Sequence, residues 1–386
     1  MGPHFSDEQI ADIKGRTDIA DLAMRLGAVL RRRGTSHIGS CPMCGGGKRA
    51  TRFKVDARGW ACAVCSDGGD VIRLVQRATS CSFAAAIDYL GGTRELSDAE
   101  KRALKDKRER EEKARAAEQA RYRKREFDRC VAIRSQCRAV SRDSVVGRYL
   151  DWRHIVLPQS ALVREHPNLA YFDGEVEDAR GFKSPRKLHE GPAMVADFVG
   201  PDGAFTGLHI TWLAGHGGGK AQIVDPETGE VLPSKKMRGH KLGSHLVLRH
   251  VENPSRLFMG EGIETTLSVA VALHATGRLR AGDEFWAAGD LGNLGGPHAG
   301  MVDHTTLKTD KGRALRIPGP RPGDGEAIVI PPSVSSLVLL GDGDSERELT
   351  RHAMERGRAR YARAGLTIAT AMAADGADFN NMLGAA

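Results

Sequence analysis

Four cysteines, arranged as two C-x-x-C pairs, constrain the fold of this chain more than any other feature of the sequence. Cys41 and Cys44 form the first pair, residues 45–61 intervene, and Cys62 and Cys65 form the second pair. Two such pairs at this separation can place four thiolates tetrahedrally around Zn²⁺, and four protein ligands leave no open position for catalysis. The pattern therefore predicts a structural zinc site; the alternative is a set of incidental buried or redox-active cysteines.

The overall cysteine usage and the hydropathy exclude two classes of protein. The chain has seven cysteines, an odd number, and the three outside the pairs (Cys81, Cys130 and Cys137) are isolated, which does not fit a secreted disulfide framework. No apolar run reaches the roughly 18 residues needed to span a bilayer, and no charged-then-apolar leader opens the chain. We expect a cytoplasmic protein of two or three domains with no membrane partner.

Short periodic segments surround the cysteine pairs. Residues 51–55 and 59–62 alternate like the strands of a hairpin, Thr17-Asp18 separates two short helices, and Gly69–Ile72 opens another helix. Over residues 6–92 this arrangement resembles the N-terminal zinc-binding domain of bacterial primases. In the cellular enzymes the second zinc ligand is often His, whereas here it is Cys44, and both residue types bind zinc. His37 is an alternative ligand, although we expect a surface or core role for it.

Basic residues gather around the predicted ribbon, and few acids offset them. The whole chain has a formal net charge of +8 and a sequence pI of about 9.2, which favours a polyanionic partner. A rigid basic β-surface can follow the phosphates of single-stranded DNA; the alternative is an ordinary solvated surface. The residues that we expect to contact DNA are Arg32, Arg49, Arg52 and Lys54.

Residues 94–130 are dominated by charge. Lysines and arginines alternate with glutamates, large apolar side chains are sparse, and no Gly or Pro occurs from Glu95 onwards in this stretch. This composition favours a solvated helix between two domains rather than a core element. We therefore expect a zinc-ribbon domain over residues 1–93, tethered by a helical linker over residues 94–130.

Two stretches in the C-terminal part end a short apolar strand with acidic residues. Leu257–Gly260 leads into Glu261 and an amphipathic run, and Ser336–Leu340 leads into Gly341-Asp342-Gly343-Asp344. In open α/β sheets ligands bind at the carboxyl ends of strands, and carboxylates there suit Mg²⁺, which also takes substrate phosphates. The implied chemistry is phosphoryl transfer. Each stretch alone could be a simple turn, a solvated loop or a calcium site.

In this order the two stretches resemble the Toprim domain of bacterial-type primases, some topoisomerases and certain nucleases. The resemblance gives Glu261, Asp342 and Asp344 the role of catalytic metal ligands. Residues 375–381 resemble a G-x-D-[FW]-N-D segment that closes the domain in phage and mobile-element primases, which makes Asp378 a fourth candidate ligand. Asn381 stands where that pattern usually has Asp. We expect the Toprim domain over residues 252–386, with an insertion at about 295–332 and with Asp290 in either a supporting or a plain surface role.

The intervening residues 131–251 have the pattern of a mixed α/β lobe. Residues 194–198 and 207–213 predict a hairpin around Pro201–Gly203, and Gly217–Lys220 lacks the Ser or Thr of a Walker A loop. The segments Thr211–Leu213 and Gly219–Ala221 look like elements of mobile-element primases, as do Lys236 or Arg238 with Gly243. The basic residues that we expect to bind nucleotides or template are Lys183, Arg186, Lys220, Lys236, Arg238 and Lys241.

Together these features predict a multi-domain α/β protein: a zinc ribbon with flanking helices, a helical linker, and a mixed α/β lobe leading into a Rossmann-like Toprim domain. The resemblance implies a DNA primase of phage or mobile-element type that uses structural Zn²⁺ and catalytic Mg²⁺ or Mn²⁺. Its partners would be single-stranded DNA, NTPs or dNTPs, and a separate replicative helicase. The alternatives are a Toprim nuclease or topoisomerase, and a catalytically inactive DNA-binding regulator.

Overall fold

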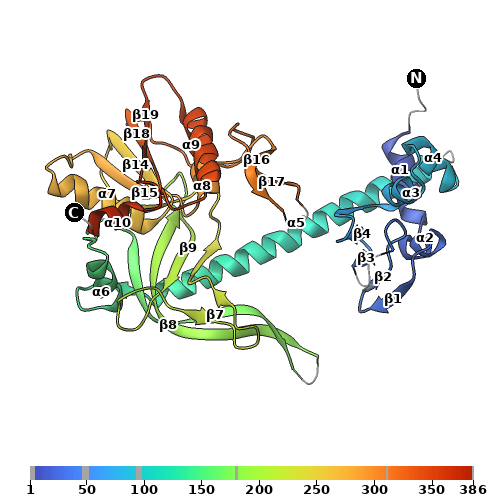
Figure 1. Cartoon of the computed structure of the whole chain (residues 1–386), viewed down its shortest axis with the longest axis horizontal. Helices are drawn as coiled ribbons and strands as arrows, with labels where there is room; N and C mark the ends of the chain where they lie inside the picture. The colour runs from blue at the N-terminus through green and yellow to red at the C-terminus, as the bar shows by residue number, and fades with distance from the viewer. Residues whose placement is uncertain (1–4, 46–51, 93–97, 179–180, 310–311, 385–386) are drawn as a thin grey trace. The chain divides into compact units, whose positions relative to one another are not determined.

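The computed structural model describes residues 5–45, 52–92, 98–178, 181–309 and 312–384. The chain divides into two compact units, Met1–Gln119 and Ala120–Ala386, which Figure 1 labels by element. Each unit is described by itself. No helix in the described part is both long enough and apolar enough to cross a membrane.

The first unit is built on a five-stranded antiparallel sheet with helices around it. The strands follow chain order: β1 (Leu30–Arg33), β2 (Ser36–Gly39), β3 (Phe53–Asp56), β4 (Gly59–Cys62) and β5 (Asp67–Gly69). The helices are α1 (Asp7–Arg16), α2 (Ile19–Arg25), α3 (Val71–Thr79) and α4 (Phe83–Tyr89). The hairpin predicted between the cysteine pairs is confirmed as β3 and β4.

Local hydrogen bonds explain where these helices begin. Asp18 caps α2 by accepting from the backbone N–H groups of Ala20 and Asp21, which produces the predicted break between α1 and α2. Asp70 caps α3 in the same way. The Trp60 indole N–H donates to the backbone carbonyl of Asp70 at 3.1 Å, so the start of α3 is attached to the sheet.

The charged segment forms one long helix, α5 (Asp98–Ser135). Its side chains are mostly exposed through the charged stretch, as expected for a solvated helix. Near its C-terminal end Cys130 is completely buried among residues of the second unit's sheet, such as Leu208 and Ile210. The end of α5 is therefore a core element of the second unit.

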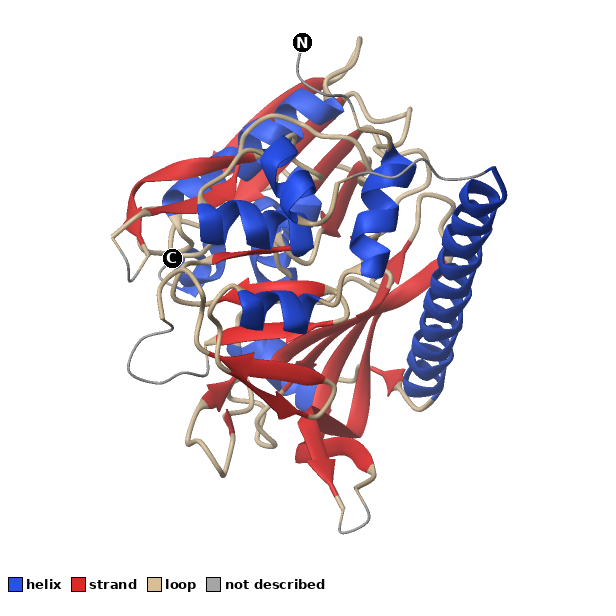
Figure 2. Ribbon diagram, turned by 90° about the vertical axis from the view of Figure 1, so that its right-hand side faces the viewer, coloured by secondary structure: helices blue, strands red, loops and turns tan. Residues whose placement is uncertain are grey.

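A ten-stranded mixed sheet forms the second unit, and Figure 2 shows its twist and the helices against it. Its main path runs β12-β9-β8-β13-β15-β14-β18-β19, and β7 and β6 continue from β8. The strands are β6 (Arg138–Ala139), β7 (Val163–Glu177), β8 (Lys183–Val199), β9 (Phe205–Trp212), β12 (Lys235–Gly239), β13 (His245–Arg249), β14 (Arg256–Gly260), β15 (Asp283–Ala287), β18 (Ser336–Gly341) and β19 (Thr367–Met372). The predicted multi-domain α/β fold class is confirmed.

Strands β15, β14, β18 and β19 are parallel, and helices cover both faces of this part. Leu257 and Met259 of β14 pack on the face that includes Met354 of α9 (Arg347–Tyr361). Phe258 packs on the opposite face with Leu267 of α7 (Ile263–Ala275). This alternation along one strand is the arrangement of a doubly wound sheet.

The antiparallel part contains two hairpins that differ in how well the sequence predicted them. Strands β8 and β9 pair antiparallel around the predicted turn, where the Gly203 N–H donates to the carbonyl of Gly200. The long hairpin of β7 and β8 was not predicted. Its outer half carries mixed polar and charged residues with little alternation, because both of its faces are largely exposed.

The expected insertion over residues 295–332 contains a small hairpin of β16 (Met301–Lys308) and β17 (Ala314–Pro318). Its buried His304 donates from Nε2 to Glu346 at 2.9 Å, while Nδ1 accepts from the backbone N–H groups of Thr306 and Leu307. The hairpin is thereby attached to the start of α9. The remaining elements are α6 (Val145–Trp152), α8 (Leu291–Gly295), α10 (Phe379–Gly384), β10 (Ile223–Val224) and β11 (Val231–Leu232).

Candidate functional site

The four paired cysteines meet at one place in the first unit. Their sulphur atoms all lie within 4.8 Å of one another, with Cys41 and Cys65 at 3.8 Å and Cys44 and Cys62 at 3.7 Å. Zn–S bonds of about 2.3 Å in a tetrahedron place neighbouring sulphurs about 3.8 Å apart. The cluster therefore has the dimensions of a structural Zn²⁺ site.

The electrostatics of the cluster also favour a cation. Burial, together with the neighbouring thiols, raises the pKa values of Cys41 and Cys65 above the ordinary value. A bound dication reverses this effect, since it is the largest local charge and stabilises thiolates. Within the described ranges this is the only group of three or more His, Cys, Asp or Glu side chains with ligand atoms this close together, and His37 is not part of it.

The expected DNA-contacting residues lie on the same small sheet. Arg32 is on β1, and its Nε donates to the carbonyl of Gly34. Arg52 and Lys54 line an open depression beside Cys62, and Lys54 pairs with Asp56 at 3.1 Å. Arg49 lies outside the described residues. Two of the four candidates are thus close neighbours on one surface next to the cysteine cluster.

The acids of the second unit leave adjacent parallel strands at one edge of the sheet. Gly260 of β14 pairs with Leu340 of β18, so Glu261 and Asp342 both follow directly after the ends of neighbouring strands. Both carboxylate oxygens of Asp342 are 2.9 Å from the Thr265 hydroxyl, which donates to them from the first turn of α7. Thr265 therefore orients Asp342 toward the loop that carries Glu261.

Position 343, between Asp342 and Asp344, requires glycine for a steric reason. A Cβ atom at Gly343 would lie 2.0 Å from the carbonyl oxygen of Ala374, and the Gly343 N–H donates to the carbonyl of Ala377 at 2.9 Å. The loop can pack against residues 374–377 only without a side chain at this position. This packing brings the segment with Asp378 beside the strand-end acids.

Carboxylates at this edge raise one another's proton affinity. Burial, with Asp342 and Asp290 as the next contributors, raises the pKa of Glu261 to about 7. Burial also raises the pKa of Asp342, and the charges of Asp378 and Asp344 add to the effect. The ligand oxygens are not all within 4.8 Å of one another. The arrangement fits Mg²⁺, which takes one or two carboxylates and completes its shell with water and substrate phosphates.

A buried glutamate three residues after Glu261 holds two lysines beside it. Glu264 of α7 accepts from the Tyr149 hydroxyl at 2.8 Å and lies 3.1 Å from Lys220 Nζ and 4.0 Å from Lys235 Nζ. Burial opposes ionisation of Glu264, yet Lys235 and Lys220 hold its pKa well below the ordinary value. The charge of Lys235 also acts on Glu261 and Asp342. The site thus combines carboxylates for a cation with ammonium groups for phosphates.

Two other candidates occupy the periphery of this site. Lys241 pairs with Asp290, which also caps α8 through the Asn293 N–H at 2.8 Å. Asp378 caps α10 through the Asn381 N–H at 2.6 Å and lies 3.4 Å from Arg153 Nη2. Each of these acids therefore has a structural role in addition to its influence on Glu261 or Asp342.

Four of the expected nucleotide- or template-binding residues lie in ion pairs away from the acids. Lys236 is next to Lys235 on β12 but points to the opposite face, where it donates to Asp173 at 2.9 Å. The other three pairs are Lys183 with Glu175, Arg186 with Asp225 and Glu227, and Arg238 with Glu126. The structure therefore places Lys220 beside Glu264 and Lys241 beside Asp290, and leaves these four elsewhere on the sheet.

Sequence reasoning missed four residues of the site: Tyr149, Lys235, Glu264 and Thr265. Glu264 had a signal, since it follows Glu261 by three residues, about one helical turn. Lys235 had a weaker one, because adjacent lysines on a strand must point to opposite faces and only one of them can meet the acids. Choosing between Lys235 and Lys236 required the register of β12 against β9.

Two protein-family models match parts of this chain. Residues 5–105 match the CHC2 zinc finger family, and residues 123–248 match a domain of unknown function, DUF7146. A comparison with curated proteins gave no match.

Similar solved structures are primase structures, at low identity. The Aquifex aeolicus primase with its zinc-binding and RNA polymerase domains has 14% identity over 99% of this chain and 83% of that chain, with a TM-score of 0.35. A DnaG primase catalytic domain bound to single-stranded DNA and the E. coli primase catalytic core each have 13% identity over 62% of this chain and 69% of that chain, with TM-scores of 0.33 and 0.32. At these TM-scores the similarities assign neither fold nor activity.

Proposed function

We propose that this chain is a DNA primase that makes short primers on single-stranded DNA by metal-dependent nucleotidyl transfer. The observation that carries the proposal is the placement of Glu261 and Asp342 at the ends of adjacent parallel strands, where burial and neighbouring acids raise the pKa of each carboxyl. A cation would relieve their repulsion. The match of residues 5–105 to the CHC2 zinc finger family supports a primase over other enzymes with such a site.

In this proposal Glu261, Asp342 and Asp344 hold Mg²⁺ or Mn²⁺, and Asp378 lies beside them. The bound metal would supply positive charge to the nucleotide phosphates as the primer 3′-hydroxyl attacks the α-phosphate. Lys220 and Lys235 bind the remaining phosphate charge in this proposal. Glu264, which accepts from the Tyr149 hydroxyl, holds both lysines. The carboxylates act through the metal and need not touch the template.

The zinc ribbon has a separate task in the proposal. Arg32, Arg52 and Lys54 contact the phosphates of the template strand, while the four cysteines keep the sheet that carries them folded. The resemblance of residues 375–381 to the closing segment of phage and mobile-element primases suggests an enzyme of that type. A separate replicative helicase would then be its partner at the fork.

The test is incubation of the full chain with single-stranded DNA, Mg²⁺ and labelled NTPs or dNTPs, followed by product sizing. Short labelled products that require template support the proposal. Shortening of labelled DNA with no nucleotides present, and no incorporation across varied templates, would identify a nuclease instead. DNA binding with neither activity would indicate a regulator.

Matched variants connect the activity to the site. Asp342→Asn should abolish incorporation and leave DNA binding unchanged, since binding rests on Lys and Arg elsewhere. Asp303→Asn is the control, because Asp303 is an exposed acid on the β16–β17 hairpin that pairs with Arg316. Equal activity of the two variants would contradict the assignment of the metal site.

A further inference from the structure

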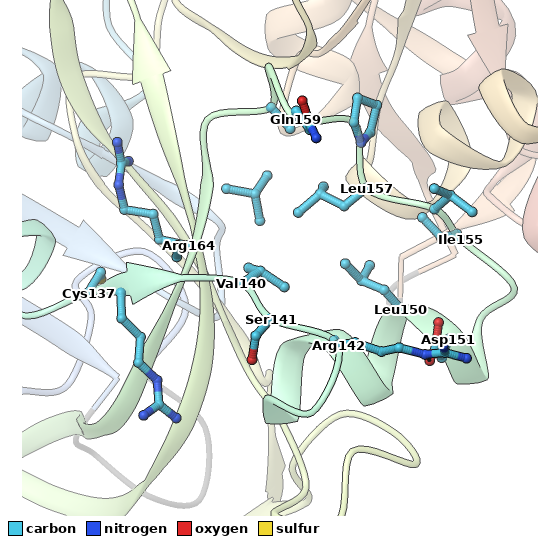
Figure 3. Close-up of a pocket in the computed structure, with 17 residues that line it drawn as sticks. Cys137, Val140, Ser141, Arg142, Leu150, Asp151, Ile155, Leu157, Gln159 and Arg164 are labelled. Atoms are coloured by element: carbon cyan, nitrogen blue, oxygen red, sulfur yellow. Dashed lines mark ion pairs between the residues drawn. The ribbon is translucent and has the colours of Figure 1, made fainter.

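A cavity of about 610 Å³ lies in the second unit, among β6, α6, β7 and the loop that joins α6 to β7. Figure 3 shows Val140, Leu150, Ile155 and Leu157 pointing into it from three segments of the chain. Leu150 and Ile155 are nearly fully buried and form the floor, whereas Val156 at the edge is 75% exposed. The volume is typical of a site that holds one or two side chains or a small ligand.

Arginines surround this apolar floor. Arg138, Arg142 and Arg164 all line the cavity, and Figure 3 shows Arg142 and Arg164 on different sides of it. Arg142 is the most exposed: its side chain is 89% accessible, and its pairing with Asp151 is loose, at 3.7 Å. The mouth of the cavity therefore presents positive charge to solvent.

Buried carboxylates hold two of these arginines in place. Arg138 donates through Nε and Nη2 to Glu165, and Arg164 donates through Nη1 to Asp197 at 2.6 Å. Glu165 and Asp197 are 0% and 1% exposed. A guanidinium has five N–H donors, so Arg138, whose side chain is 61% exposed, keeps donors for a ligand while Glu165 orients it. Such fixed donors reduce the entropy lost on binding. The guanidinium of Arg164 points away from the apolar side chains, so Arg164 contributes positive charge at the edge rather than a contact.

The lining distinguishes between two kinds of anionic partner. Single-stranded nucleic acid sites combine basic grooves with aromatic side chains on which bases stack, and no aromatic residue lines this cavity. Its aliphatic floor instead fits a Leu, Ile or Phe side chain. Asp151 at the edge disfavours a continuous phosphate backbone but can accept from a peptide N–H.

We propose that this cavity binds an acidic peptide segment of a partner protein. One apolar side chain of the segment enters among Val140, Leu150, Ile155 and Leu157, and flanking carboxylates pair with Arg138 and Arg142. The proposal is independent of primer synthesis, because none of these residues touches the acids or lysines of the candidate catalytic site.

The test is fluorescence anisotropy with the full chain and a fluorescein-labelled peptide of alternating Asp and Leu. Arg142→Glu should weaken binding roughly tenfold or more, since it replaces a charge-assisted contact by repulsion. Leu157→Ala should weaken binding by removing part of the wall. Arg313→Glu makes the same charge change at an exposed site on the β16–β17 hairpin and should leave binding unchanged.

Two further probes test whether binding needs the charges and the apolar side chains of the peptide, and whether a nucleic acid binds at the same place. Peptides with Ser in place of Leu, or Asn in place of Asp, should each bind much more weakly than the original peptide. An oligothymidylate should not displace the peptide. The proposal is overturned if the peptide fails to bind, if Arg142→Glu binds as well as the unchanged chain, or if the oligothymidylate competes at this site. Thermal unfolding of each variant confirms that the fold is retained.

Discussion

Lys220 Nζ lies 3.1 Å from a carboxylate oxygen of Glu264, a buried acid that also lies 4.0 Å from Lys235 Nζ. Glu264 is stabilised in its charged form by two lysines and a tyrosine. Glu261, three residues earlier, is destabilised in its charged form by burial and by other acids. Removing the charge of each should therefore have opposite effects on stability.

The first prediction compares Glu264→Gln with Glu261→Gln at neutral to alkaline pH, in protein that keeps its zinc and has no added Mg²⁺ or Mn²⁺. Glu264→Gln leaves Lys220 and Lys235 without their buried counter-charge. Because the side chains of these lysines are 34% and 40% exposed, water screens them, and we expect a loss of about 1 kcal/mol of unfolding free energy. Glu261→Gln removes a repelled carboxylate and should leave stability equal or higher. Urea unfolding at a single pH checks both. A stabilising Glu264→Gln would contradict the role given to the ion pair.

The second prediction separates two adjacent lysines. Lys235→Met should lower nucleotide incorporation roughly a hundredfold, because it removes one fixed positive group near the phosphates. Lys236→Met should leave incorporation nearly unchanged, since Lys236 bonds to Asp173 and lies over the Tyr171 ring on the other face of the sheet. Steady-state incorporation by both variants at saturating template is the measurement. Equal losses of incorporation in the two variants would contradict the assignment of Lys235, rather than Lys236, to the face of β12 that meets the acids.

The third prediction concerns acid pH. Burial lowers the pKa of His209 to about 4 and that of His245 to about 3, whereas an unfolded His titrates near 6.5. Between these values the unfolded chain binds more protons, so the free energy of unfolding should fall as pH falls from about 6.5 toward 4. Each group contributes up to about 1.4 kcal/mol per pH unit.

A substitution at His245 tests this dependence. Its ring stacks on Trp286 with a centroid distance of 3.5 Å, so His245→Phe keeps an aromatic ring and removes the titrating group. The number of protons taken up on unfolding should fall by about one between pH 6.5 and 4, so the unfolding free energy should depend less steeply on pH. His274→Gln, at an exposed position at the end of α7, should leave the slope unchanged. If His245→Phe leaves the pH dependence of the unfolding free energy unchanged, the assignment of that dependence to His245 is wrong.

The fourth prediction concerns the zinc cluster. Cys62→Ser, or removal of metal by a chelator, should unfold the first unit, because the binding free energy of a structural zinc is also folding free energy. The second unit should stay folded, since its core does not include the cysteine cluster. Zinc analysis and limited proteolysis check this. Cys81→Ser is the control: Cys81 lies outside the cluster, and its loss should leave zinc at about one per chain.

Local patterns predicted the elements of the site, and pairing between distant segments decided how they combine. The Glu261 turn and the Asp342–Asp344 turn could be read as strand ends from short apolar runs, and the two strands are indeed adjacent and parallel. The cysteine spacing was sufficient to predict the cluster, because the ligand geometry requires little else. In both cases the chemistry lies within a few residues of the motif.

The rest depends on contacts that no short stretch contains. Tyr149 reaches Glu264 across more than a hundred intervening residues, and the arginine-lined cavity is formed by segments on both sides of α6. Lys236 was named from its resemblance to a segment of mobile-element primases, and the register that places Lys235 on the opposite face of β12 is not visible in the sequence. Basic residues on the outer strands were grouped by sequence, while the structure gives each of them its own acid.

Because His304 is attached to Glu346, the backbones that carry the candidate acids Glu261 and Asp344 are held in different ways. Glu261 follows a strand that is hydrogen-bonded on both sides, by β15 and β18, so its backbone is fixed. Asp344 is two residues from Glu346, whose carboxylate caps α9 and also accepts from His304. The β16–β17 hairpin is therefore linked, through His304 and Glu346, to the loop that carries Asp344. The backbone before Glu261 is thus held by two neighbouring strands, whereas the loop of Asp344 is connected through Glu346 to a peripheral hairpin.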